Sequence, residues 1–116
     1  MKELSGVWKG AWHVAGAAAA VGLVLPVLDD PKRRLTAQFD LGQACAVMQI
    51  TAADLGIGSG HANVGDQDLA RRLLNLPEDR ELCRIIDFGL PADRPLAPIE
   101  KLDRRDFDEV VHWDVW

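Results

Sequence analysis

The chain of 116 residues is long enough for one domain with a modest hydrophobic core. Its apolar content of 48% and charged content of 27% are typical of a folded domain and exclude a disordered chain. The formal net charge of −5 argues against a general nucleic-acid binder, because neutralising phosphates requires a basic surface. We therefore expect a single domain over residues 1–116.

The N-terminal segment predicts a short amphipathic helical stretch followed by a buried strand. The helical spacing is carried by apolar residues: Leu4, Val7, Trp8, Ala11 and Trp12. The continuous apolar run from Ala17 to Leu25 ends at Pro26, which is typical of a strand buried on both faces. A signal peptide is the alternative, but the run is followed by no small-residue cleavage site and is too short to span a bilayer.

A long central helix is predicted from about Pro31 to Leu55. Asp30 can cap its first turn, Pro31 suits the first helical position, and Gly56 is a natural stop. One set of small and apolar residues keeps to one face: Leu35, Phe39, Gly42, Ala46, Ile50 and Ala53. A second set widens the apolar surface: Leu41, Cys45, Met48 and Ala52. A helix apolar on most of its circumference needs cover on most sides, which in so small a chain suggests a partner subunit.

Gly42 in mid-helix costs about 1 kcal/mol relative to alanine, and close packing against it would offset that cost.

The second half of the chain alternates turn signals with short elements. Gly56 to Gly65 is predicted as a glycine-rich loop, and Asp66 as the cap of a short helix over Gln67 to Leu74. Leu82 to Leu90 is predicted as a strand. The three prolines between Pro91 and Pro98 predict an extended connector.

Spacing alone indicates little catalytic chemistry. The histidines His13, His61 and His112 are scattered and form no metal-ligand pair with either cysteine. Cys45 and Cys83 are expected to be reduced core residues of a cytoplasmic protein, with a disulfide as the alternative. The glycines of the predicted loop follow a helix rather than a strand, so a dinucleotide-binding motif lacks its required context.

An ordered set of short motifs runs through most of the chain. They are Asp40, Gly42, Ala52-Ala53-Asp54-Leu55-Gly56, Asp66, Leu76-Pro77-Glu78, Gly89-Leu90-Pro91-Ala92-Asp93, Arg104-Arg105 and Val110-Val111-His112-Trp113. This set resembles the FMN-dependent nitroreductase family. The resemblance implies an α/β (α+β) fold in which a central helix packs on a small mixed sheet and a dimer partner completes the domain.

The resemblance also implies an FMN cofactor and the residues that bind it. It places the segment after the central helix, His61, Ala62, Asn63 and Val64, beside the reactive part of the isoalloxazine, mainly through backbone groups. Backbone donors there would stabilise the charge that develops on reduction. The alternative is that this segment is only a connector.

Arg104 and Arg105 could bind the FMN phosphate, since guanidinium groups offer paired donors to phosphate oxygens. The alternative is a solvated surface in which they pair with the neighbouring aspartates, Asp103, Asp106 and Asp108.

The implied activity is hydride transfer from NAD(P)H to the flavin and then to a nitro, quinone or related acceptor, in a homodimer, with no catalytic side chain and no metal. The C-terminal arm from His112 to Trp116 would pack on the other subunit, or alternatively on its own. The Arg-Arg-Ser-like segment with which the family grips the phosphate near its N-terminus is not present, so the chain resembles an N-terminally truncated member. A non-catalytic flavin-fold remnant that acts as a binding or interaction module is therefore the alternative function.

Overall fold

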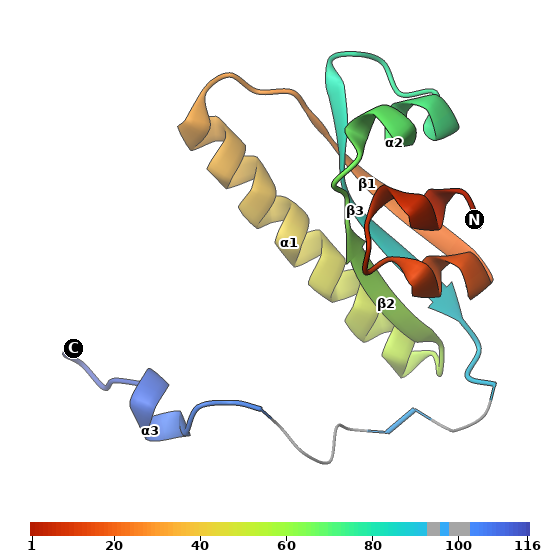
Figure 1. Ribbon diagram of the computed structural model, residues 1–116. Helices are drawn as coiled ribbons and strands as arrows, with labels where there is room; N and C mark the ends of the chain where they lie inside the picture. Colours follow the sequence, from red (N-terminus) through yellow and green to blue (C-terminus); the bar gives the residue numbers. More distant parts are fainter. Residues whose placement is uncertain (93–95, 98–102) are drawn as a thin grey trace.

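The computed structural model describes residues 1–92, 96–97 and 103–116. The elements in chain order are η1 (Leu4–Val7), η2 (Trp12–Gly16), β1 (Ala19–Pro26), α1 (Pro31–Asp54), β2 (Gly58–Asn63), α2 (Gln67–Leu74), β3 (Arg80–Gly89) and α3 (Phe107–Val110). The predicted fold class is confirmed, because one long helix lies along a small sheet (Figure 1).

The described sheet has three strands in the order β1-β3-β2, and β3 pairs antiparallel with both neighbours. β1 and β2 therefore run in the same direction without touching, because the connection through α1 leaves a gap of one strand that β3 fills. The three strands are antiparallel throughout, where a mixed sheet was expected. The register shifts between Leu23 and Val24, which leaves Cys83 as an extra, bulged residue of β3.

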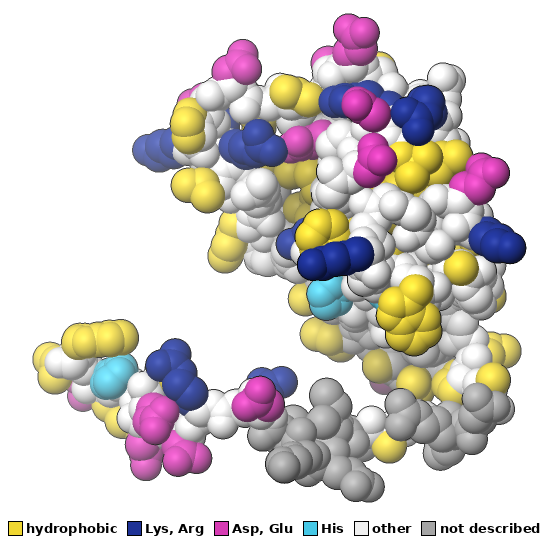
Figure 2. Space-filling view, viewed as in Figure 1, with side chains coloured by type: hydrophobic (Ala, Val, Ile, Leu, Met, Phe, Trp, Pro, Cys, Tyr) yellow, Lys and Arg dark blue, Asp and Glu magenta, His cyan; other side chains and the backbone are white. Residues whose placement is uncertain are grey.

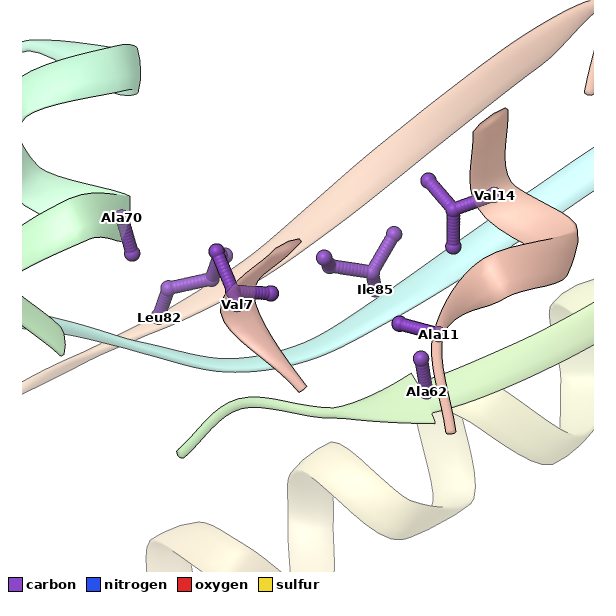
Figure 3. Close-up of a cluster of buried hydrophobic side chains, with 7 residues drawn as sticks. All are labelled: Val7, Ala11, Val14, Ala62, Ala70, Leu82 and Ile85. Atoms are coloured by element: carbon purple, nitrogen blue, oxygen red, sulfur yellow. The ribbon is translucent and has the colours of Figure 1, made fainter. Parts of the chain in front are cut away.

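The hydrophobic core lies on the sheet face opposite α1. η1, η2 and α2 cover this face, and their apolar side chains meet those of β2 and β3 (Figure 3). The buried cluster consists of Val7, Ala11, Val14, Ala62, Ala70, Leu82 and Ile85. The amphipathic stretch predicted at the N-terminus thus supplies part of the core, as two 3-10 turns rather than one helix.

The ends of α1 are those predicted. The carboxylate of Asp30 accepts a hydrogen bond of 2.9 Å from the Lys32 amide, and Gly56 follows the helix with φ +71°. Only the second of its two predicted apolar sets turns toward the sheet, where its residues are half-buried or buried: Leu41, Cys45, Met48 and Ala52. Ala37, which neither set included, is half-buried as well.

The other set, which we call the outer stripe, is exposed: Leu35, Phe39, Gly42, Ala46, Ile50 and Ala53. The side chains of Phe39 and Ile50 are each 70% exposed. The described chain alone therefore leaves this side of α1 uncovered, and the partner subunit that the sequence suggests as its cover stays a prediction.

β1 is confirmed as a strand, but it is not buried on both faces. It is an edge strand, and Val21 and Val24 are about 40% exposed. α1 packs against β2 and β3, so β1 has little cover on the side of the sheet where α1 lies.

The C-terminal residues 103–116 form an arm that extends from the body (Figures 1 and 2). Its aromatic residues contact one another, with ring centroids 6.4 Å apart for Phe107 and Trp113 and 4.3 Å apart for His112 and Trp116. Trp113 is 75% exposed and Trp116 fully exposed, so the arm does not dock on its own subunit here.

Among the helices of the described chain, none combines the length and hydropathy that crossing a bilayer requires.

Candidate functional site

A groove of about 380 Å³ lies between the first half of α1 and the sheet. Gly42 and Cys45 form part of the helical wall, and His61, Cys83 and Arg84 form part of the opposite wall on β2 and β3. The volume is in the range of small-molecule sites, which is roughly 300–1,000 Å³. The groove is therefore our candidate site.

Gly42 helps to keep the groove open. A Cβ at this position would meet no heavy atom within 4 Å, so the expected close packing against Gly42 is not present in the described chain. Gly42 belongs to both the groove wall and the outer stripe, which means that the groove opens beside the uncovered face of α1.

The groove carries a net positive charge although the whole chain is acidic. Its charged wall residues are Arg34, Glu81 and Arg84, against a net charge of −5 for the chain. Arg34 Nη2 donates to both carboxylate oxygens of Glu81, at 3.1 and 3.0 Å. Arg84 donates only to the carbonyl of Cys83, at 3.3 Å, and no described carboxylate lies within ion-pair distance of it.

Cys83 lies among these three charges. Burial raises the pKa of the Cys83 thiol and the Glu81 carboxylate raises it further, while a hydrogen bond with the Leu25 backbone and the guanidinium groups of Arg34 and Arg84 oppose the shift. The thiol is therefore protonated and a poor nucleophile at neutral pH. Both cysteines are free, as expected, but they are half-buried groove residues rather than core residues.

The segment from Gly56 to Gly65 was expected to be a loop, and this is wrong. Most of it is β2, which pairs with β3 from Gly58↔Gly89 to Asn63↔Arg84. Sequence reasoning missed the strand because its glycines and small residues carry no alternating apolar pattern.

The strand separates the predicted flavin-contact residues onto two faces. His61, which is exposed, and Val64, which is half-buried, line the groove. The side chain of Ala62 is buried in the core on the other face, and Asn63 is exposed and does not line the groove. As an edge strand, β2 can still direct some backbone donors and acceptors away from β3.

Arg104 and Arg105 belong to the exposed arm, which extends away from α1 and the sheet (Figure 1), and neither lines the groove of the same chain. The structure thus brings together His61 and Val64 but not the arginine pair. It adds Arg34, Cys83 and Arg84, which sequence reasoning did not select. The polar residues Glu81, Cys83 and Arg84, which come just before the apolar Ile85 and Ile86 in β3, were the signal that could have revealed them.

A second polar pair lies on the core face of the sheet. His13 Nδ1 and Asp87 Oδ1 are 2.9 Å apart, and Asp87 is only 8% exposed. The pair joins η2 to β3 and fills the space above Gly60. We assign it a structural role, since the groove is on the other face.

No protein-family model and no curated protein sequence matches the chain. Solved structures do match it. A nitroreductase family protein from Clostridium difficile 630 aligns with a TM-score of 0.73 at 20% identity, over 99% of this chain and 67% of that chain. An FMN-dependent nitroreductase from Clostridium difficile R20291 aligns with a TM-score of 0.76 at 20% identity, over 99% of this chain and 69% of that chain.

This chain has a nitroreductase-like fold. At this identity the likeness shows the fold alone, and the chain spans about two thirds of the length of these two proteins. The fold confirms the resemblance drawn from the sequence motifs.

The chemical groups that line the groove of this nitroreductase-like fold fit those of an FMN. Leu41, Cys45 and Val64 provide apolar surface for a ring system, and Arg34 and Arg84 provide guanidinium donors for an anion. The residues do not fit a metal: in the described ranges, no three His, Cys, Asp or Glu side chains are grouped so that they could hold an ion.

Proposed function

We propose that the protein is an FMN-dependent NAD(P)H oxidoreductase of the nitroreductase type that reduces nitro, quinone or related acceptors. The observation that supports this most is the open groove beside α1 in a nitroreductase-like fold, lined by His61 and Val64. A bound flavin supplies the hydride-transfer chemistry, and the protein supplies binding and orientation. No side chain of the chain is required as a nucleophile.

In this proposal the groove holds the ring system. The apolar walls exclude water from one side, and backbone groups of the segment His61, Ala62, Asn63 and Val64 donate hydrogen bonds at its edge. Gly42 contributes by leaving room in the helical wall.

We further propose a homodimer, because the outer stripe of α1 is apolar and uncovered. A second copy on this stripe would also border the groove through Gly42. The arm of the second copy could then bring Arg104 and Arg105 to the phosphate, which the arm of the same chain does not do here. The two free thiols favour a reducing compartment, so we place the protein in the cytoplasm.

The experiment is a titration of the purified protein with FMN and riboflavin, followed by flavin fluorescence, with an NAD(P)H oxidation assay on the loaded protein. Arg104→Ala/Arg105→Ala should weaken FMN about tenfold and riboflavin little, because only FMN carries the phosphate. Arg33→Ala, an exposed change at the start of α1, is the control. A parent protein that stays colourless with excess FMN contradicts the proposal.

The alternative function is a non-catalytic binding or interaction module. The exposed aromatic side chains of the arm favour it, because large apolar groups in water mark a surface that contacts another protein. A folded protein that dimerises but binds no flavin would be this module.

A further inference from the structure

We propose that Arg84 is the anion-binding residue of the groove and that it contacts the phosphate of a phosphorylated ligand. The inference rests on the proposed function in taking FMN as that ligand. It adds a contact from the body of the chain to the phosphate contact that the proposed function assigns to Arg104 and Arg105 on the arm of the second copy.

The sheet holds Arg84 in place at the groove. This residue lies in β3, the central strand, opposite Asn63 of β2 and Leu23 of β1. The side chain is half-buried and forms part of the groove wall together with His61 and Val64. A guanidinium on a central strand is held more rigidly than one on an exposed arm. Binding a ligand therefore costs less conformational entropy of the arginine side chain.

The two arginines of the groove wall differ in how their charge is compensated. Of the two arginines in the groove wall, Arg34 is neutralised by Glu81 through two hydrogen bonds. Arg84 has only the weak bond to the Cys83 carbonyl, and its remaining donors are not taken by any described side chain. A partly desolvated guanidinium without a carboxylate is a strong site for a phosphate or another anion.

The charge of the groove is opposite in sign to that of the chain as a whole. A net charge of −5 repels anions from most of the surface, so a groove with net positive charge selects where an anionic ligand enters. The neutral amide of Gln67 does not compete for the ligand, because it is bound on both sides to the backbone of Leu82, at 2.7 and 3.1 Å.

The test compares FMN, riboflavin and pyrophosphate on the full chain and three variants. Arg84→Gln should weaken FMN about tenfold, the effect of one charged hydrogen bond, and leave riboflavin within about twofold. Glu81→Gln should strengthen FMN, because it frees Arg34 and removes the only carboxylate among the described groove residues. Arg72→Gln, on the exposed side of α2, should change neither ligand.

If Arg84 binds an anion, Arg84→Gln and Glu81→Gln should change FMN affinity in opposite directions. If the two residues have only a structural role, both variants should bind FMN more weakly. Circular dichroism and thermal melts of each variant confirm that it is folded. Equal losses of FMN and riboflavin in Arg84→Gln, or no loss of either, would overturn the inference.

Pyrophosphate distinguishes this inference from the proposed function. If pyrophosphate raises the melting temperature of the parent but not of Arg84→Gln, the anion site is supported even if FMN does not bind. If the parent binds neither FMN nor pyrophosphate, both proposals fail together.

Discussion

Gly60 and Gly42 meet opposite surroundings. A Cβ at Gly60 would lie 2.9 Å from Asp87 Oδ1 and 3.2 Å from His13 Nδ1, whereas a Cβ at Gly42 would meet open space. Both glycines have backbone angles that other residues adopt, since Gly56 is the only described glycine with positive φ. Their roles therefore differ through packing alone: Gly60 makes room for a polar pair and Gly42 leaves a cavity.

We expect Gly60→Val to lower the free energy of unfolding by about 1–3 kcal/mol, because it overpacks the site of the His13–Asp87 pair. Gly42→Ala should raise it by up to about 1 kcal/mol, because alanine favours the helix and meets nothing. Urea denaturation of both variants measures the two changes. A neutral Gly60→Val would show that η2 moves aside freely.

Cys83 should remain a thiol to a higher pH than an ordinary cysteine. In a Cys45→Ser background, the rate of iodoacetamide alkylation should rise with a midpoint above that of a free cysteine, because burial and Glu81 disfavour the thiolate. A midpoint below it would mean that Arg34 and Arg84 dominate.

The same shift links Cys83 to stability. The folded chain binds this proton more tightly than the unfolded chain, so the contribution is complete below the ordinary thiol pKa and is lost as pH rises through the raised pKa. As pH rises through this alkaline range, the free energy of unfolding of Cys83→Ser should therefore fall less than that of the parent.

At the scale of the elements, the sequence predicted best where a local signal fixes a boundary. Asp30 with Pro31 and Asp66 mark helix starts through side-chain caps, and the structure contains both caps. Gly56 marks the end of α1 because its positive φ suits glycine. β2 was missed because what makes it a strand is β3, a partner more than 20 residues away in sequence.

The groove was missed for a related reason. Its walls come from α1, β2 and β3, and the local periodicity of a sequence contains no information on the distance between a helix and a sheet. The two apolar sets on α1 were visible in the sequence, but which of them faces the sheet depended on packing between distant elements.

Asp66 provides the test of capping. Its carboxylate accepts a hydrogen bond of 2.8 Å from the Leu69 amide at the start of the eight-residue α2. Asp66→Ala should cost about 1 kcal/mol, measured by urea denaturation. Asp68→Ala removes a carboxylate from the same turn that is 85% exposed, and should cost only a few tenths of a kcal/mol. Equal losses of stability in Asp66→Ala and Asp68→Ala would mean that the capping hydrogen bond adds nothing to the effect of a negative charge at the start of the helix.

The whole molecule is more extended than a single compact domain. Its radius of gyration is 16.8 Å, and a compact chain of this length would have about 13 Å. The C-terminal arm extends from the body and contributes to the difference (Figures 1 and 2). The arm and the uncovered outer stripe of α1 are what we expect of a chain that pairs with a second copy.

We predict self-association through the outer stripe of α1. Light scattering at micromolar concentration should report a dimer, and Ile50→Glu should shift it toward monomer because it places a charge in the stripe. Thr51→Glu adds the same charge at an exposed position on another side of the helix and should leave the dimer intact. A folded, monomeric parent would contradict this prediction.

The strand order also constrains how the chain folds. Every described pairing in the sheet involves β3, and the pairs with β1 join residues such as Ala19 and Phe88 that are far apart in sequence. During synthesis, β1 and β2 therefore cannot pair into the sheet until residues 80–89 have emerged from the ribosome. Such non-local closure slows folding and leaves the apolar strand β1 exposed to association with other chains. The yield of soluble protein should accordingly be most sensitive to substitutions in β3, the last strand to arrive.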